Sequence, residues 1–526
     1  MGMKMLINNF PVLSFLIWFP IISGFLFLSF FVKLQYNRQF LQICVSISSG
    51  ICLIISCFIF YYFDSKISSL QNIEYREWIP TLGINYFLGI DGFSLLFVIL
   101  TCLMTFLVII YSFNSIKEKV VLYFSCFLIM QGLMCGVFLS IDSILFYIFF
   151  EAMLIPMFLL IGIWGSTNRI YATLKFFLYT FFGSVFLLIS IIYLHYISIK
   201  EGYLLSESFS IFTFQNLFLT FYQQKWLFFA LLLAFAIKIP MWPMHTWLPD
   251  AHVEAPTGGS VILAAITLKI GGYGMLRLLL PIVPDACSFY SKFVILLSIV
   301  AIIYIGFVAI VQSNMKKMVA YSSISHMGFV TLGLFLIFQL PRHMTNSEFL
   351  YDGIMSVQGS MFQMISHGFI AGALFFCVGV LYERLHTKEI FDFGGVANVM
   401  PIFSIFFLIF ALSNTGLPGT SGFVGEFFII LITYKVSFWL SFCTATTLIL
   451  SASYTLWLYK RVMFGSLKNE LILTLSDLSI YEKFIFVILS GLVLFFGIYP
   501  EPLIVVMDYS IENLIYHIFK FRVFTE

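Results

Sequence analysis

The chain has 526 residues, with 27 Lys or Arg and 25 Asp or Glu, so charged residues make up only 10% and the net charge is +2. Apolar residues reach 61%, and the mean hydropathy is +1.03. A water-soluble protein of this length could not keep that much apolar surface from water, and a near-zero net charge offers no basic footprint for nucleic acid. The composition therefore excludes a soluble enzyme, a disordered chain and a nucleic-acid-binding protein.

The apolar segments have the length of membrane-spanning helices. A helix of about 20 residues crosses roughly 30 Å of hydrocarbon, and the alternation typical of a barrel strand is missing here. The sequence therefore predicts an all-α, polytopic membrane protein with about 14 transmembrane helices. In chain order we expect them at 10–32, 40–62, 87–111, 120–140, 143–164, 171–197, 226–248, 257–281, 288–312, 317–338, 357–382, 400–430, 434–461 and 480–500.

Positive charge on the connections predicts the orientation of the chain. One set of loops holds Lys33, Arg38, Lys117, Lys119, Arg169, Lys316, Lys317, Arg384, Lys388, Lys460, Arg461 and Lys468, and the other face holds Lys66, Arg76, Lys200, Lys225, Lys292, Arg342 and Lys435. The richer set is expected inside, so both termini are expected on the outer, positively charged side of the energised membrane. Residues 198–225 and the tail 503–526 are expected to lie along the surface.

The sequence predicts no metal-binding or cofactor-binding residues. The nine Cys are scattered, mostly within apolar segments, and show no CxxC or Cys/His ligand spacing. There is also no GxGxxG motif after a strand and no run of Fe–S ligands. We therefore expect no redox centre on this chain.

A few ionisable side chains fall at mid-membrane depth, where they are costly and usually mark an ion or proton pathway. They are Glu151, Lys238, Lys269, His326, His367 and Glu426. Two other interpretations stay open: the Glu and Lys side chains could form static ion pairs that fix helix register, and the His side chains could serve only in packing.

Helix breakers flank two of these positions. Pro240 and Pro243 follow Lys238, and Leu417-Pro418-Gly419 precedes Glu426. Because proline frees carbonyl groups that lipid cannot satisfy, the pattern predicts two broken helices in two inverted five-helix repeats. Ordinary proline kinks are the alternative. His245 and the polar run HTWLPDAHVEAPTGG after the first break fit either a water-filled half-channel or a solvated loop.

At these residues the sequence resembles the chain 4 family of respiratory NADH:ubiquinone oxidoreductase (complex I), whose members are antiporter-like membrane-arm subunits. The resemblance rests on the runs LGIDGFSLLFVILT, FYIFFEAMLIPMFLLIGIWG, FFLYTFFGSVF, IKIPMWPMHTWLPDAHVEAPTGGSVILAAITLKIGGYGMLR, KKMVAYSSISHMGFVTLG, SHGFIAGALFFCVGVLYER, LPGTSGFVGEF and SYTLWLYKRV. The chain departs from the family pattern in its first span, its tail and residues 339–356, where PRHMTNSEFLYDG lengthens a loop.

The resemblance implies roles for the buried ionisable residues. It implies that Glu151 and Lys238 form the essential carboxylate–lysine pair of a proton channel and that Lys269 is its central lysine. It also implies that His326 is an intervening relay and that Glu426, which is lysine in some family members, is the exit-side residue. His245 and His367 match family positions near the hydrated path, and Pro240 and Pro418 match the helix breaks.

The resemblance also implies the domain organisation and the partners. The expected parts are helices 1–3 (residues 1–115), a first repeat (116–285), an inverted second repeat (286–465) and a last helix with a surface tail (466–526). NADH, FMN, Fe–S clusters and ubiquinone would bind to partner subunits, other membrane-arm subunits and lipids would surround the chain, and nucleic acid would not bind. The location would be the mitochondrial inner membrane.

Three other functions remain possible from the sequence. An Mrp-type cation/proton antiporter subunit would share the same channel residues, and a non-pumping membrane scaffold would use the buried charges only for packing. A chloroplast quinone oxidoreductase subunit is the third. A pump whose Glu151 is replaced by Gln should still assemble and lose coupling, whereas a scaffold should lose assembly together with activity.

Overall fold

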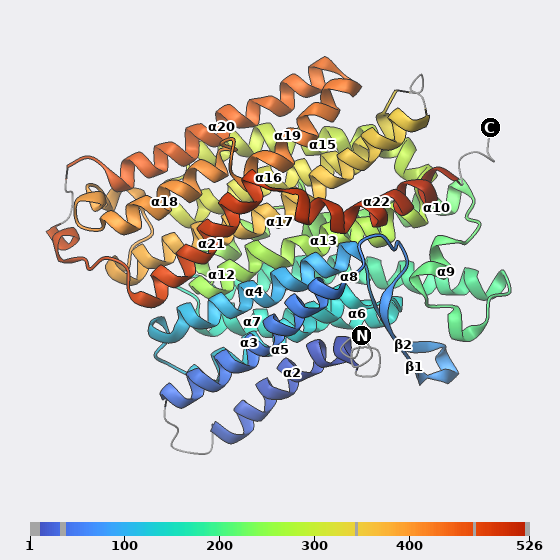
Figure 1. The fold of residues 1–526 in the computed structure, drawn as a ribbon, viewed down its shortest axis with the longest axis horizontal. Helices are drawn as coiled ribbons and strands as arrows, with labels where there is room; N and C mark the ends of the chain where they lie inside the picture. The colour runs from blue at the N-terminus through green and yellow to red at the C-terminus, as the bar shows by residue number, and fades with distance from the viewer. Residues whose placement is uncertain (1–10, 32–37, 342–345, 467–469, 521–526) are drawn as a thin grey trace.

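The computed structural model describes residues 11–31, 38–341, 346–466 and 470–520. Lys33, Arg342, Lys468 and the end of the predicted surface tail (521–526) lie outside these residues, as do both ends of the predicted first span. Figure 1 shows the described chain as a bundle of long helices that run roughly side by side. The described part is therefore helical in the way the sequence predicted.

Fourteen helical segments cross the bundle within the described residues. They are α2 (Val12–Phe31), α3 (Arg38–Tyr62), α4 (Gly92–Ser115), α5 (Val120–Leu139), α6 (Ser143–Ala152) with α7 (Leu154–Trp164), α8 (Arg169–Lys200), α10 (Phe221–Lys238) with α11 (Trp247–Glu254), α12 (Thr257–Ile262) with α13 (Leu268–Gly274) and α14 (Leu280–Ile282), α15 (Pro284–Ile310), α16 (Met315–Leu336), α17 (Asn346–Leu385), α18 (Pro401–Asn414) with α19 (Ser421–Val436), α20 (Phe438–Met463) and α21 (Ile480–Ile498). Eleven of them are long and apolar enough to span a membrane by themselves. The other three, namely the α10–α11 pair, the α18–α19 pair and α20, complete the predicted number.

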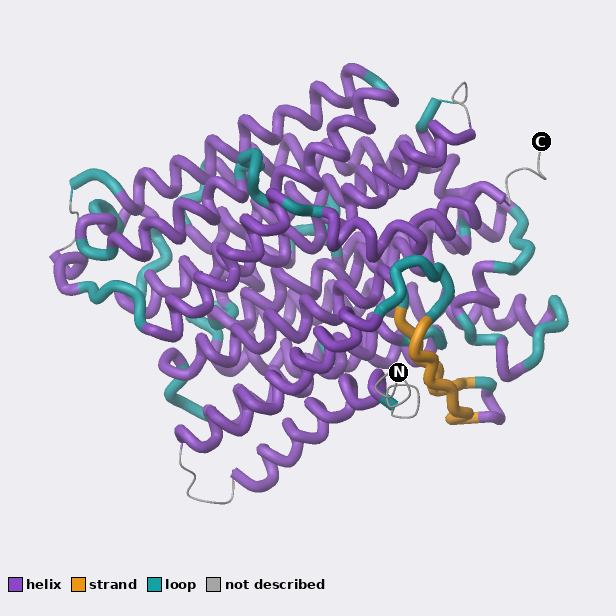
Figure 2. Tube along the Cα trace, viewed as in Figure 1, coloured by secondary structure: helices purple, strands orange, loops and turns teal. Residues whose placement is uncertain are grey.

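A β-hairpin precedes the third span, which corrects the predicted helix start at residue 87. Strands β1 (Gln71–Ile79) and β2 (Ile84–Ile90) pair antiparallel, and they are the two orange strands in Figure 2. The apolar run of β2 looks like helix because periodicity cannot separate a short buried strand from a helix. Asp91 ends the strand and starts α4, since its carboxylate accepts the Ser94 amide at 3.0 Å in a capping box.

The central helix α17 is 40 residues long and begins eleven residues before the predicted start at 357. The residues assigned to a lengthened loop, from 346 onward, therefore form its first turns. Polar residues at this end hide the helix in the sequence, but they have partners: Asp352 pairs with Lys435 of α19 at 2.6 Å, and Gln358 donates to Asp508. The first turns of the helix are thus stabilised by polar contacts with α19 and Asp508, whereas most of the rest of α17 is apolar and buried.

The predicted surface tail forms helix α22 (Glu501–Lys520), which packs across α4 and α17. The other segment expected on the surface, 198–225, is shorter than predicted. Helix α8 continues to Lys200 and α10 begins at Phe221, so that only the residues between them, with the short helix α9 (Ile211–Gln215), connect the two spans.

Both predicted helix breaks are present. Helix α10 ends at Lys238, and the Trp247 indole of α11 donates to the Ile237 carbonyl at 2.9 Å, so a protein group satisfies the broken end. Pro418 lies between α18 and α19, where Gly416 adopts a left-handed conformation with φ of 73°. The sequence did not predict two π turns, Leu263–Thr267 and Met275–Leu279, which interrupt the span formed by α12, α13 and α14.

Candidate proton path

The first pair of candidate residues lies where α6, α8 and α10 meet. The Glu151 carboxylate, in the last turn of α6, accepts a hydrogen bond from the Ser184 hydroxyl of α8. Lys238 is the last residue of α10 and only 3% exposed, and its ammonium lies 4.7 Å from the centroid of the Phe150 ring. Among the described ion pairs there is none between Glu151 and Lys238 within 4.0 Å, although the two charges interact at longer range.

Lys269 lies at the centre of the bundle and is completely buried. Its ammonium donates to the Ala264 carbonyl at 2.5 Å and contacts Nδ1 of His367 at 2.7 Å. Ala264 belongs to the π turn that directly precedes α13, and π turns are often found at functional sites. The turn therefore supplies one of the two contacts that hold the lysine.

The helices of the two lysines are in direct contact. A side chain at Gly271 would lie 3.0 Å from Cβ of Lys238 and 2.9 Å from the Ile239 amide nitrogen. Only a residue without Cβ lets α13 approach the broken end of α10 this closely. Lys238 and Lys269 thus lie on touching elements.

The second pair joins α16 to the second broken helix. Nδ1 of His326 lies 2.7 Å from Oε1 of Glu426, and the Gln363 amide of α17 donates to the same oxygen at 3.2 Å. The side chains of His326 and Glu426 are only 4% and 2% exposed. A carboxylate buried this deeply needs such partners, because burying an ion without them is costly.

One gap separates these contacts. The rings of His326 and His367 lie 6.0 Å apart between centroids, and Nε2 of each ring has no protein hydrogen-bond partner. A cavity of about 10 Å³ lies beside both rings, and Gln363 and Glu426 also line it. This is about the space that one water needs, and the unpartnered polar atoms could hydrogen-bond to it.

The structure gives the secondary candidates different positions. His367 lies between Lys269 and His326, so it occupies a more central place than the sequence indicated. His245 lies in the break after α10, and no described contact joins it to this row of residues. Ser184 and Gln363 were missed, because polar residues in apolar spans carry no signal until their neighbours are known.

The polar run after the first break is mostly anchored rather than freely solvated. Asp250 pairs with Lys175 at 2.7 Å, and the Glu254 carboxylate accepts the Asn168 amide at 3.1 Å. His252 is completely buried, stacks on Phe375 with ring centroids 4.4 Å apart, and has no protein partner at either ring nitrogen. Neither a simple loop nor an open channel describes this segment.

Comparison with known proteins identifies the family. The NADH:quinone oxidoreductase/Mrp antiporter transmembrane family matches residues 140–451. Relatives include "NADH-quinone oxidoreductase subunit M" of Rickettsia bellii, 46% identical over 97% of this chain and 99% of that protein. "NADH-ubiquinone oxidoreductase chain 4" of Marchantia polymorpha is 41% identical over 89% of this chain and 90% of that protein.

Solved structures agree with this result. A chain of respiratory complex I from Thermus thermophilus matches with a TM-score of 0.82 and 27% identity, over 96% of this chain and 99% of that one. A chain of the Mrp complex from Dietzia shares the fold, with a TM-score of 0.81 at 18% identity, over 96% of this chain and 97% of that one. The chain therefore belongs to the NADH:quinone oxidoreductase/Mrp antiporter family of multi-pass membrane proteins.

Proposed function

We propose that this chain is a proton-translocating membrane-arm subunit of respiratory complex I, of the chain 4 type. The observation that supports the proposal most is the row of titratable side chains that runs from half-buried Glu151 and buried Lys238 through Lys269 to Glu426. Charged groups at this depth are costly, and the contacts from Lys269 to His367 and from His326 to Glu426, both at hydrogen-bond distance, suit proton transfer better than packing alone.

The contacts suggest an order of transfer in the second half of the row. The Lys269 ammonium donates its proton to Nδ1 of His367, and His367 releases its Nε2 proton to one water in the small cavity. That water passes a proton to Nε2 of His326, and the Nδ1 proton of His326 moves to Glu426. This order requires that neutral His326 carries its proton on Nδ1 and neutral His367 carries it on Nε2.

The first half of the row controls when Lys269 is loaded. Glu151 is held by Ser184 and interacts with Lys238 at longer range, so a shift of α6 against α10 changes how strongly the carboxylate stabilises the ammonium. A charge change in a neighbouring subunit supplies the trigger. Lys238 then passes its proton by way of water to Lys269, whose helix α13 contacts the end of α10.

Redox chemistry belongs to partner subunits in this proposal. NADH, FMN, Fe–S clusters and ubiquinone bind there, and the complex as a whole is the H⁺-translocating NADH:ubiquinone reductase. The proposed location is the mitochondrial inner membrane, and the similarity to the Marchantia chain 4 protein supports it more than the similarity to the Rickettsia proteins does. Residues 116–285 and 286–465 form the two inverted repeats.

Glu151→Gln in the assembled complex separates a pump from a scaffold. We expect normal assembly on native gels and reduced NADH-driven proton translocation, because the amide keeps the size of the side chain but cannot carry the charge. Glu201→Gln is the matched control, since Glu201 accepts the Phe218 amide at 3.2 Å in a loop outside the row. Loss of assembly in step with activity would instead support a scaffold.

A further inference from the structure

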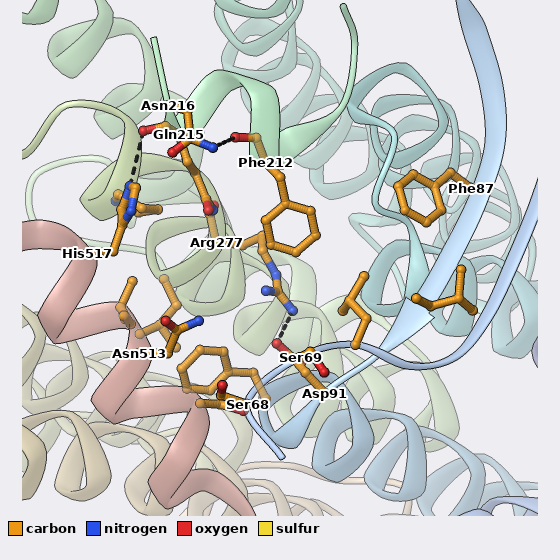
Figure 3. A pocket seen from close by; sticks show the side chains of 17 residues that line it. Ser68, Ser69, Phe87, Asp91, Phe212, Gln215, Asn216, Arg277, Asn513 and His517 are labelled. Carbon is orange, nitrogen blue, oxygen red and sulfur yellow. Dashed lines mark hydrogen bonds and ion pairs between the residues drawn. The ribbon is translucent and has the colours of Figure 1, made fainter. Parts of the chain in front are cut away.

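A polar cavity of about 570 Å³ opens at the membrane face that carries the β-hairpin and α22. Figure 3 shows Arg277 near its centre, with Asn216, which follows α9, on one side and Asn513 and His517 of α22 on another. Asn216, Asn513 and Ser69 at its rim are exposed, so water reaches this cavity, which we name the vestibule. The vestibule lies outside the row of residues described above.

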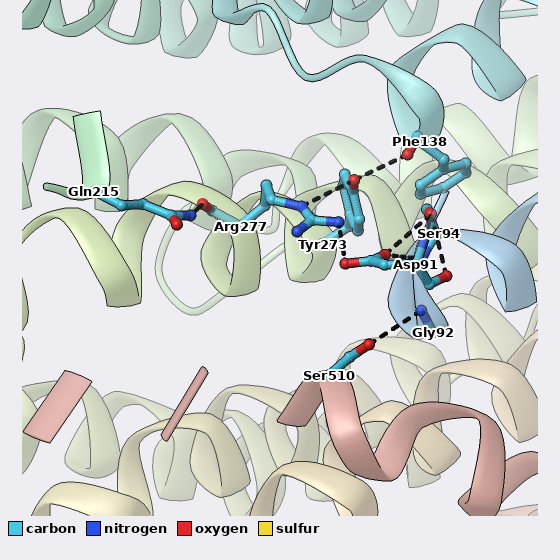
Figure 4. Close-up of polar contacts among 8 residues, drawn as sticks. All are labelled: Asp91, Gly92, Ser94, Phe138, Gln215, Tyr273, Arg277 and Ser510. Atoms are coloured by element: carbon cyan, nitrogen blue, oxygen red, sulfur yellow. Dashed lines mark hydrogen bonds and ion pairs between the residues drawn. The ribbon is translucent and has the colours of Figure 1, made fainter. Parts of the chain in front are cut away.

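A buried ion pair forms the floor of the vestibule. Nη2 of Arg277 lies 2.6 Å from Oδ2 of Asp91, and the two residues are 6% and 5% exposed. The other Asp91 oxygen accepts the Ser94 amide at the start of α4, while Nε of Arg277 donates to the Tyr273 hydroxyl at 3.2 Å (Figure 4). Both charges are thus fixed in place by further hydrogen bonds.

Closely packed aromatic rings lie beneath this pair. The Tyr273 ring contacts the rings of Phe97, Phe138 and Phe146, with centroids 6.1, 5.2 and 6.5 Å away, and all four residues are completely or almost completely buried. The Tyr273 hydroxyl donates to the Phe138 carbonyl at 2.9 Å, so its proton and its oxygen are both engaged. We name these four rings the aromatic collar.

Tyr273 of the collar lies between the central lysine and Arg277 of the vestibule along the span. Lys269, Tyr273 and Arg277 are spaced four residues apart on one span, which places Lys269 roughly 12 Å from Arg277 along the helix axis. Without the collar, vestibule water would lie two helical turns from Lys269. Direct proton transfer from Lys269 to this water would let a proton leave before it reached His367.

We propose that the Asp91–Arg277 pair and the aromatic collar form a seal that keeps protons of the vestibule away from Lys269. The guanidinium is always protonated and cannot relay a proton, the Tyr273 hydroxyl is committed on both sides, and the packed rings offer water no hydrogen-bond partner. The seal keeps the vestibule from acting as a second exit for the Lys269 proton besides the His367 route. This inference rests on the proposed function, because it assumes that Lys269 carries protons.

The test is the passive proton conductance of proteoliposomes that hold the assembled complex, without NADH. Asp91→Asn combined with Arg277→Gln removes both charges and leaves neither buried alone. We expect the conductance attributable to the complex to rise about tenfold, as a barrier lowered by roughly 1.4 kcal/mol would give. Unchanged conductance in the assembled double variant would overturn the proposal.

Matched variants show whether the effect is specific. Asp352→Asn with Lys435→Gln neutralises another ion pair, which joins α17 to α19 and does not line the vestibule. This double variant should keep the conductance of the parent. Adding Lys269→Ala to the leaking double variant should restore low conductance, because the leak would run through that lysine. A leak that persists in this triple variant would show that the protons do not pass through Lys269, which contradicts the proposal.

Labelling with a membrane-impermeant thiol reagent tests the boundary without neutralising the pair. Ser69→Cys at the rim should react, and Ser94→Cys, at a completely buried position behind Asp91, should not. Equal labelling of both, above the background of the native cysteines, would overturn the seal. If these results hold but Lys238→Ala pumps normally, the proposed role of Lys238 in pumping fails, while the seal beside Lys269 stands.

Discussion

The two halves of the bundle hold the carboxylates of the row differently: Glu151 is half-buried, whereas Glu426 is buried. In the first half, Glu151 is bonded to a neutral hydroxyl and interacts with Lys238 only at longer range. In the second half, Glu426 contacts His326 at 2.7 Å and Gln363 at 3.2 Å. Small helix movements can change the strength of the interaction between two separated charges, whereas two side chains in contact are ready for proton transfer. The comparison therefore suggests that the first half controls proton loading and that the second half delivers the proton.

The helix breaks support the same distinction. Lys238 is the last residue of α10, where the negative end of the helix dipole stabilises a cation. Glu426 is the sixth residue of α19, beyond the first turn in which a helix dipole acts, so its charge depends on the contacts with His326 and Gln363. The first break thus stabilises its charge through a helix end, and the second through side chains.

The largest expected effect comes from removing the contact in the second half. His326→Ala leaves a buried carboxylate without its closest partner and should lower the stability of the subunit by about 3 kcal/mol. His326→Gln keeps a hydrogen-bond donor but cannot relay a proton, so we expect near-normal thermal stability together with lost proton translocation. Equal translocation by the Gln variant and the parent would show that His326 is not part of the delivery step.

A smaller effect is expected at the second break. A Cβ at Gly416 would lie 3.0 Å from Oε2 of Glu426, whereas one at Gly419 would meet nothing within 4 Å, and both glycines have a left-handed φ. Gly416→Ala and Gly419→Ala should each cost about 1–2 kcal/mol of stability through the backbone. Proton translocation, measured with each assembled variant, should fall only for Gly416→Ala. Equal losses would mean that the contact with Glu426 is unimportant.

Ser184→Ala should have a milder effect in the first half. It removes one hydrogen bond to a carboxylate that is only partly buried, at a cost of about 1 kcal/mol. Because Ser184 positions Glu151 but carries no charge, we expect slower NADH-driven proton uptake with normal assembly. Ser190→Ala, on the same helix and bonded only to the Phe186 carbonyl, is the control. A loss as large as that of Glu151→Gln would indicate that the hydroxyl itself relays protons.

The smallest effect concerns the cap of the helix that carries Glu151. Asp142 lies just before α6 and accepts the Ile144 and Leu145 amides, and burial raises its pKa to about 6. Because the folded state holds this proton more tightly than the unfolded chain, the contribution of Asp142 to stability is largest below the unfolded pKa of 3.8 and decreases as the pH rises through 6. Asp142→Asn should lack this pH-dependent contribution, so the difference in thermal stability between the parent and the variant should change as the pH rises from 3.8 to about 6. A difference that stays constant over this range would contradict the prediction.

Much of the fold could be predicted from the sequence because the membrane imposes the length and composition of each span. The breaks at Pro240 and Pro418 were predictable for the same reason, since proline removes a hydrogen bond that lipid cannot replace. The β-hairpin and the start of α17 were not, because strand β2 is a short apolar run and the first turns of α17 depend on contacts with α19 and α22.

The sequence indicated which residues belong to the candidate site but not which of them contact one another. A search for ionisable residues within apolar spans finds Lys269, His367 and Glu426. It cannot show that His367 lies between Lys269 and His326, because that position depends on the packing of α13, α16 and α17. The sequence also did not indicate a role for Arg277, because its partner Asp91 is 186 residues away in the sequence.

The proton-to-electron ratio of the reconstituted complex with Lys238→Ala tests the central claim most directly. Lys238 joins the control half of the row to Lys269, so its removal should interrupt delivery even though electrons still flow in partner subunits. We predict a ratio below that of the parent at matched NADH oxidation rates. A ratio equal to that of the parent would exclude Lys238 as an obligatory carrier and contradict the account.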